Sequence, residues 1–220
     1  MANVNTWSGV TVSIQSALGT AISIASITKA SPGVVSTDYG SPSPGAHGLA
    51  SGSYIVLDTL GMDQVDNRVF RVASPTTYTL QLENENTTSY NTFSSGTAQL
   101  ITFGTTINTI TGLSGSGGDF DFIDTTTIHQ TSRTQIPGPS APGTYTCESI
   151  WDPGDTGLIA LKAASDAKSV RAIMFAFSSG AKVVFNGYVA CSMIPTGSAL
   201  DKVITPIAIT MFGTPTAFSS

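Results

Sequence analysis

The sequence predicts a mainly β protein with one flanking α-helix, and three observations support this fold class. Apolar residues alternate with Thr and Ser in several short segments, as they do in half-buried strands. The 22 glycines and 11 prolines divide the 220-residue chain into such segments. Charged residues are only 10% of the chain, which suits a β protein whose surface is covered by copies of itself. The length allows one large β domain or two smaller ones.

The first strands are expected within residues 7–27. Val10, Val12 and Ile14 alternate with Thr and Ser, and Ile22 and Ile24 repeat the same period of two. Residues 28–100 then change character, because Gly, Pro and Ser dominate their first part and short strand candidates follow at 53–60, 68–74 and 77–84. This segment is expected to form a small β unit. His47 lies in its Gly-rich turn and is expected to be solvated.

Residues 105–113 predict a further strand, and the glycines at 114–118 predict a flexible hinge. A second break is expected at 137–143, where Pro and Gly recur, and residues 144–151 predict a strand. The segment between these breaks, residues 115–142, is too long for an ordinary loop inside a compact domain and is therefore expected to be functional.

One helix is expected at about residues 152–167. Asp152 can cap its first turn with Pro153 at the first helical position, and Leu158 and Leu161 share one face with Ala164 or Ser165. Residues 170–194 predict a β-hairpin that turns at 178–180. The last strand is expected at 202–213, where Pro206 predicts an edge position or a bulge.

A search for catalytic or metal-binding chemistry finds no strong motif. Asp119, Asp121, Asp124 and His129 are the best candidates, and a hydrolase built on them remains an alternative hypothesis. A calcium loop that starts at Asp119 would need an oxygen ligand where Ile123 stands. The sequence shows no phosphate-binding loop, nucleophile elbow or zinc-ligand spacing. We therefore predict that the protein is not an enzyme and holds no metal or cofactor.

Charge and cysteine usage narrow the remaining classes. A net charge of −5 with scattered Lys and Arg disfavours binding to nucleic-acid phosphates, although an acidic wall would let DNA slide past. Cys147 and Cys191 lie in expected strands, where buried free thiols are favoured and a disulfide stays open. Neither a secretory signal nor an apolar run of membrane-spanning length is apparent, so no membrane partner is expected.

The segment at 115–142 is therefore expected to be an arm that orders against a neighbouring subunit and is mobile in the monomer. The candidate arm contacts are Asp119, Phe120, Asp121, Phe122, Asp124, Thr125, Thr126, Thr127, Ile128, His129, Arg133, Ile136 and Pro137. Asp119 and Asp121 should lie on one side of a strand, and Phe120 and Phe122 on the other.

Several motifs together resemble one known family. GGDFDFIDTTTIHQTSRTQIPG (117–138), IWDPGDTGLIALKAASD (150–166) and VFNGYVACSMIPTGSALDKVITPIAITMFGTP (184–215) are similar to the major tail tube proteins of bacteriophages with long, non-contractile tails. Residues 28–100 are similar to a small β-barrel repeat inserted in many phage virion proteins, which is related to a domain of ubiquitin-activating enzymes. That segment contains no cysteine, so no ubiquitin chemistry is implied.

The resemblance implies a β-sandwich or barrel formed by residues 1–27 and 101–220, with residues 28–100 inserted on the outside. It implies hexameric rings that stack into a tube, in the virion tail, after assembly in the cytoplasm of the bacterial host. The implied partners are further copies, the tail tip or baseplate, the tape measure and tail terminator proteins, and genomic DNA that passes through without specific binding. Asp119, Asp121 and Glu148 are candidates for an acidic lining of the lumen.

A second hypothesis treats residues 28–100 as a host-surface or carbohydrate-binding module of the virion. Its motivation is three aromatic residues that the sequence suggests are exposed, Tyr39, Tyr54 and Tyr90. Exposed aromatic side chains on an exterior domain would offer a binding surface. The alternative is that the segment only decorates the virion and binds nothing.

Overall fold

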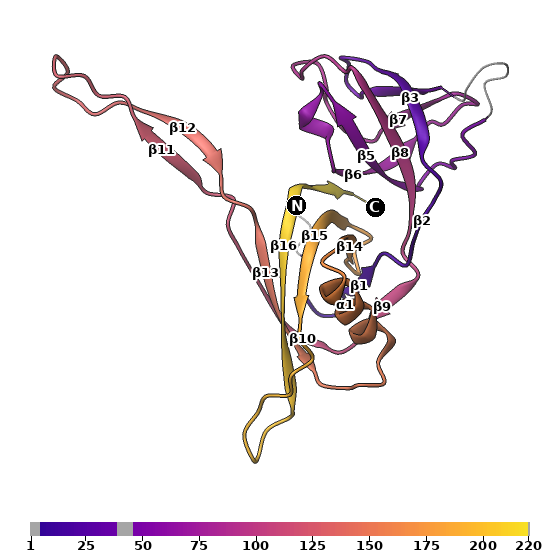
Figure 1. Cartoon of the computed structure of the whole chain (residues 1–220), viewed down its shortest axis with the longest axis vertical. Helices are drawn as coiled ribbons and strands as arrows, with labels where there is room; N and C mark the ends of the chain where they lie inside the picture. Colours follow the sequence, from indigo (N-terminus) through magenta and orange to yellow (C-terminus); the bar gives the residue numbers. More distant parts are fainter. Residues whose placement is uncertain (1–4, 39–45, 220) are drawn as a thin grey trace.

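The computed structural model describes residues 5–38 and 46–219, and its strands form a seven-stranded sheet, a small barrel and a projecting hairpin (Figure 1). Within the described residues there is one α-helix, α1 (Thr156–Asp166), and one short 3-10 helix (Asp63–Val65). The predicted mainly β fold with one flanking helix is confirmed. No helix of the described part is long and apolar enough to span a membrane.

The seven-stranded sheet is antiparallel throughout and curls around α1. In sheet order its strands are β10 (Ile110–Ser116), β13 (Thr144–Ile150), β16 (Ile204–Phe218), β15 (Lys182–Cys191), β14 (Val170–Ala176), β1 (Thr11–Ile14) and β9 (Thr105–Ile107). Residues 105–113, expected as one strand, form two strands on opposite edges of the sheet. Only Asn108 and Thr109 separate these strands, so the two edges approach each other there and the sheet is half of a barrel.

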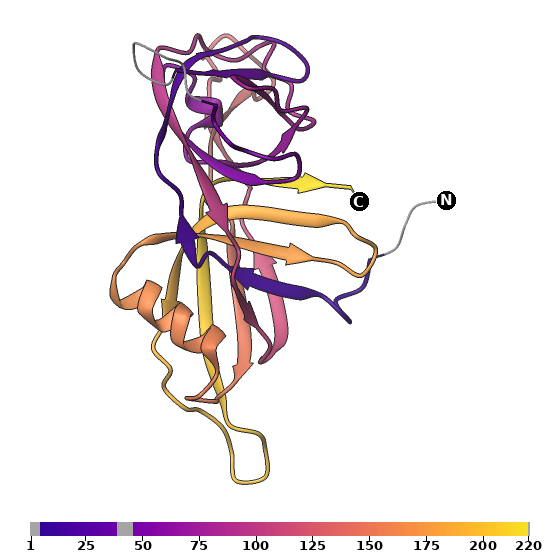
Figure 2. The same ribbon diagram turned by 90° about the vertical axis from the view of Figure 1, so that its right-hand side faces the viewer.

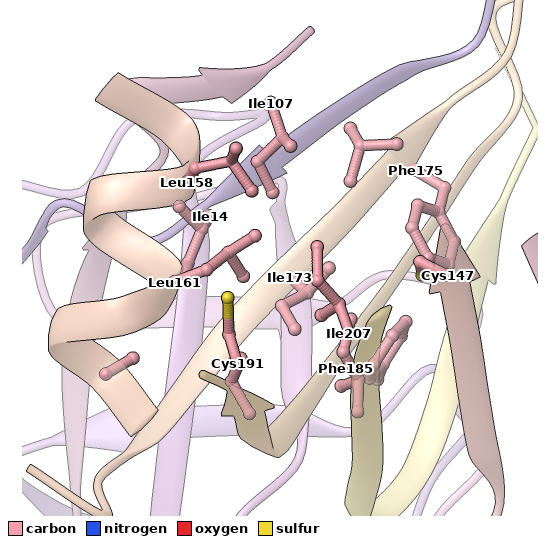
Figure 3. Packing of buried hydrophobic residues seen from close by; sticks show 14 residues of the cluster. Ile14, Ile107, Cys147, Leu158, Leu161, Ile173, Phe175, Phe185, Cys191 and Ile207 are labelled. Atoms are coloured by element: carbon pink, nitrogen blue, oxygen red, sulfur yellow. The ribbon is translucent and has the colours of Figure 1, made fainter. Parts of the chain in front are cut away.

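The core of this half-barrel lies between α1 and the sheet (Figure 3). Leu158 and Leu161 of α1 are buried against Ile14 and Ile173, as the 3.6-residue period predicts. The predicted helix start is wrong. Asp155 caps the helix through its Oδ1, which accepts the Leu158 N–H at 2.8 Å. The Oδ1 of Asp152 instead accepts the Gly154 N–H at 2.9 Å, so it caps the preceding turn.

The last strand differs most from its prediction. β16 runs to Phe218, five residues beyond the expected end, and it lies between β13 and β15 instead of at an edge. Pro206 is tolerated because the pairing of β16 with β15 begins only at Ile207, opposite Cys191. Pro206 therefore lies beyond the end of β15, where its missing N–H breaks no bond to that strand.

The two cysteines are free and buried, as predicted. Both flank Ile207, because Cys147 of β13 pairs with it from one side and Cys191 of β15 from the other. Their Cα atoms are thus two strand spacings apart, about 10 Å, whereas a disulfide needs less than about 7 Å. This register settles the question of pairing that the sequence left open.

The second unit is a closed barrel with its own core. Its strands are β3 (Ile22–Ile27), β4 (Val34–Thr37), β5 (Tyr54–Leu60), β6 (Val69–Ala73), β7 (Thr79–Leu82) and β8 (Ser95–Thr102), and β2 (Ala17–Leu18) adds to β8. β8 pairs with both β3 and β5, which closes the barrel. The barrel therefore begins with a strand that the sequence suggested belonged to the flanking segment 1–27.

His47 is not solvated, contrary to the expectation. Its side chain is only 7% exposed. The Nδ1 atom accepts the Leu49 N–H at 3.0 Å, and Nε2 lies 3.2 Å from the carbonyl oxygen of Thr79. Both ring nitrogens thus have partners, and the residue holds a turn of the barrel in place.

The barrel lies beside the end of β16 (Figure 2). It packs on the sheet through a shared apolar cluster that includes Tyr54, Val69, Val184 and Phe218. Thr216 Oγ1 donates to the carbonyl oxygen of Val69 at 2.6 Å, next to this cluster. The barrel is therefore joined to the end of β16 by packing and hydrogen bonds as well as by the chain.

Candidate functional site

The candidate functional site is a hairpin that projects from the sheet, formed by β11 (Phe120–Asp124) and β12 (Gln135–Ser140) (Figure 1). Within the described residues these strands pair only with each other. All the candidate arm residues lie on or beside this hairpin. The two breaks predicted at 114–118 and 137–143 are shorter in the structure, because β10 continues through Ser116 and β12 includes Pro137.

Glycine backbone geometry sets the base of the hairpin. Gly117 and Gly118 have φ values of 96° and 87°, which strain any residue with a side chain. A Cβ on Gly117 would also lie 2.5 Å from the carbonyl oxygen of Pro142. Across the base, the Gly118 N–H donates to the Ala141 carbonyl oxygen at 3.1 Å. The chain therefore leaves the sheet through a bonded, glycine-dependent turn.

Threonine side chains hold the tip together. The Thr126 N–H donates to Asp124 Oδ1 at 2.8 Å, and the Thr134 N–H donates to Thr126 Oγ1 at 3.0 Å. Gln130 Oε1 accepts the Thr127 N–H at 3.0 Å. Hydrogen bonds from Thr126 lower the pKa of the exposed Asp124 carboxyl. The polar residues of this segment thus shape a loop.

The hairpin exposes apolar side chains on both faces. Phe120, Phe122, Ile123 and Ile136 are each more than half exposed. Phe122 pairs with Pro137 and Ile123 with Ile136, so adjacent pairs point to opposite faces. The register shift places its extra residue in β12, which leaves the expected alternation of β11 intact. Ile128, in the tip, is 95% exposed.

The proposed hydrolase residues are not gathered in a cavity. Asp119, Asp121, Asp124 and His129 are all exposed on this hairpin. Arg133 Nε lies 3.9 Å from Asp124 Oδ2, and both side chains are well exposed. In the described part of the chain, no group of three His, Cys, Asp or Glu side chains could hold a metal ion.

Glu148 lies apart from the other two lumen candidates, on the face of β13 that points away from the core. Thr146 and Ile150 share this exposed face. Thr146 pairs with Ser114 and Ala208 on the neighbouring strands, and Pro206 stands opposite Glu148. Small uncharged residues thus surround a single carboxylate, whereas Asp119 and Asp121 are on the hairpin.

The aromatic residues behind the binding-module hypothesis are not the exposed platform expected. Tyr54 is only 9% exposed and packs edge-on against Phe103, with ring centroids 5.5 Å apart. Tyr90 is partly buried, and its hydroxyl donates to Glu85 Oε1 at 2.6 Å. Tyr39 lies outside the described residues. Two of the three aromatics are therefore structural parts of the barrel.

Two further surfaces were not predicted from the sequence. One is a groove of about 520 Å³ at the base of the hairpin, lined in part by Ala141, Tyr145 and Met211. The other is the loop 192–203, in which Leu200 is 100% and Ile194 61% exposed. Apolar residues in a loop give no sequence signal that distinguishes exposure from burial, so only the structure reveals them.

One comparison with known proteins identifies a family. A family model described as phage tail tube protein, TTP, matches residues 60–220. The match takes in the hairpin, α1, the loop 192–203 and the barrel strands from β6 to β8. No curated protein matches the chain.

Proposed function

The chain belongs to the phage tail tube protein family, and on this basis we propose that it self-assembles into hexameric rings that stack into the tube through which phage DNA is delivered. The protein would then be a structural component of the virion tail, assembled in the cytoplasm of the bacterial host. Its partners would be other copies and the tail-tip or baseplate, tape measure and terminator proteins. DNA would pass through the tube without specific binding.

The projecting hairpin is the observation that carries this proposal. It exposes Phe120 and Phe122 on one face and Ile123 and Ile136 on the other, yet pairs with no other strand of the described monomer. Monomeric proteins seldom expose contiguous apolar surface of this kind without a partner. A hairpin that is apolar on both faces suits insertion between two neighbouring subunits, which agrees with its expected role as the assembly arm.

The edges of the half-barrel support closure into rings. β10 and β9 each pair on one side only within the described residues. Open strand edges are ready to pair with another chain, and a head-to-tail contact forms a ring when its rotation closes. A sheet that continued from subunit to subunit would leave no free edge.

We assign the face of β13 that bears Glu148 to the lumen. Its neighbours across the sheet are Ser114, Thr146, Pro206 and Ala208, which carry no charge. A neutral to acidic wall would not bind the DNA phosphates and would let the duplex slide. The barrel, which runs from β3 to β8 and so takes in residues 22–27 as well as 28–100, would lie on the tube exterior. The seven-stranded sheet with its helix would form the wall.

The direct test is to concentrate the purified protein and image it by negative-stain electron microscopy. Rings or hollow tubes are expected. A chain that stays monomeric at every concentration, even when phage tail-tip complexes are added as initiators, would contradict the proposal. A tube without a central channel would contradict the role in DNA delivery alone.

A further inference from the structure

We propose that the loop 192–203 of one subunit docks into the groove at the hairpin base of the next subunit along the tube. This inference rests on the proposed tube function and names a contact that would join successive rings. The occupant of the groove is therefore a second copy of the same chain.

The loop 192–203 is well suited to dock into a groove, because it is exposed and carries apolar side chains. Every residue from Ile194 to Val203 is exposed. Leu200 is 100% exposed, Ile194 61% and Val203 46%. Backbone hydrogen bonds between Thr196 and Ile204, both at 2.8 Å, close the loop at its neck. It therefore presents apolar side chains from a bonded frame, which costs less entropy on docking than a free segment would.

The neck is also anchored to the body. The indole Nε1 of Trp151 donates to the carbonyl oxygen of Met193 at 2.8 Å. At the tip, Ser198 Oγ donates to Asp201 Oδ2, and the Asp201 N–H donates back to the Ser198 carbonyl oxygen at 3.1 Å. These bonds fold the tip into a turn that partners Asp201, and they leave the Leu200 side chain fully exposed.

The groove has complementary chemistry. None of the described residues that line it is charged, and it combines Tyr145, Met211 and Pro215 with glycine backbone. A groove of about 520 Å³ is large enough for several aliphatic side chains. An uncharged groove suits the apolar side chains of the loop, whereas the exposed Asp201 and Lys202 would remain outside it.

The position of the two surfaces makes the partner a second copy. β16 begins at the end of the loop, at Ile204, and reaches the groove at Met211. The two surfaces are thus separated along one strand by about 25 Å. The loop projects from one end of the molecule, whereas the hairpin projects toward the other (Figure 1), and the groove is lined by residues at the base of that hairpin. Two complementary surfaces at opposite ends form a head-to-tail contact that repeats without closing, as a stacked tube requires.

Crosslinking tests the contact directly. The double variant Leu200→Cys, Ala141→Cys would be assembled, imaged, treated with a short flexible bismaleimide and run on a denaturing gel. We expect a ladder of covalent multimers, because each chain offers one thiol to each of two neighbours. Each single variant can give dimers at most. The buried Cys147 and Cys191 should not react in the folded protein.

The matched control is Leu200→Cys with Ser51→Cys, which places the second exposed thiol on a barrel loop. It should give no ladder. Tubes of the Leu200→Cys, Ala141→Cys protein without a ladder would overturn the loop–groove contact and leave the tube function standing. Failure to assemble with any initiator would count against both proposals.

A substitution gives a second, independent readout. Leu200→Ser should leave the folded monomer and the rings unchanged and should prevent their stacking. Leu60→Ser changes a residue that is 66% exposed on the barrel, and tubes should still form. Tubes of normal length from Leu200→Ser would contradict the proposed contact.

Discussion

At the scale of single residues, two groups show how local hydrogen bonding and burial decide roles that the sequence alone does not determine. Asp152 and Asp155 both precede the helix, and Asp152 is the cap that the sequence predicts. The structure selects Asp155, because only its carboxylate reaches the Leu158 N–H. Cys147 is held between neighbouring strands, away from water.

The helix cap can be tested by substitution. Asp155→Ala should lower the free energy of unfolding by about 1 kcal/mol, because it leaves a first-turn N–H without a partner. Asp152→Ala is the matched control and should cost only about 0.3 kcal/mol, since its bond supports an exposed turn. Urea denaturation measures both. A larger loss of stability for Asp152→Ala than for Asp155→Ala would instead support Asp152 as the helix cap, as the sequence predicts.

The burial of Cys147 predicts a pH dependence. Burial raises the pKa of its thiol from 9.0 to about 11. The folded state therefore favours the neutral thiol, and this contribution is complete below pH 9 and is lost as the pH rises toward 11. The wild-type protein should lose on the order of 2 kcal/mol across that window relative to Cys147→Ala. Parallel denaturation curves for the two proteins at every pH would contradict this prediction.

At the scale of elements, the hairpin and the last strand depart most from their sequence patterns. Within the segment 115–142 the sequence predicts strand geometry only at residues 119–122, because Gly, Pro and Thr interrupt any longer period. Threonine-to-backbone bonds and the pairing of Ile123 with Ile136 nonetheless give it β structure. β16 was expected to end at Gly213. It continues because the strand passes Gly213, whose φ is 85°, with a register shift, and then pairs again with β15 from Thr216 opposite Val184 to Phe218 opposite Lys182.

Phe122→Ser tests the hairpin as an assembly element. The side chain is 63% exposed in the monomer, so the melting temperature should change by no more than about 1 °C. Rings or tubes should be lost, because their interface would lose a central aromatic contact. Tyr78→Ser, at an exposed barrel site, should assemble normally. If electron microscopy shows that Phe122→Ser assembles normally, Phe122 is not part of the interface between subunits.

At the scale of the whole molecule, side chains join the barrel to the sheet around the end of β16. Arg71 pairs with Glu83, and its guanidinium lies over the Phe218 ring, 4.8 Å from the centroid. It also donates to the Ser219 carbonyl oxygen at 3.2 Å. Nearby, Asn186 Nδ2 donates to the Asn67 carbonyl oxygen at 2.7 Å. The barrel is thus held on the end of β16 by side chains from both units.

Arg71→Ala should loosen this junction and cost roughly 1–3 kcal/mol, since it removes a cation–π contact and leaves Glu83 without its partner. Calorimetry should show the barrel and the sheet beginning to unfold separately. The exposed Arg133→Ala serves as the control and should leave the transition unchanged. A single transition at the wild-type temperature for Arg71→Ala would show that the packing alone holds the barrel.

Glu148→Lys tests the lumen assignment in phage. A cation in the channel wall would attract the DNA phosphates, so DNA ejection should slow by about twofold or more. Asp58→Lys makes the same change of charge at an exposed barrel position and should have no effect. Ejection followed with a DNA-binding dye provides the rate. Equal ejection rates for both variants would contradict the assignment of Glu148 to the lumen.

By itself, the sequence determined the fold class, the core face of the helix and the strands within residues 53–84. These depend on periods of 2 and 3.6 residues, which are local properties of the chain. It also singled out the projecting segment and resembled the tail tube family.

Only the tertiary structure decided the rest. The pairing of Cys147 and Cys191 with opposite sides of Ile207, the closure of the barrel by β8 and the central position of β16 are choices of strand register. Register depends on which distant segments meet across a sheet, and side-chain alternation is the same for every partner. The exposure of Leu200 could not be predicted from the sequence either, because burial depends on how distant segments pack together and the residue type alone does not determine it.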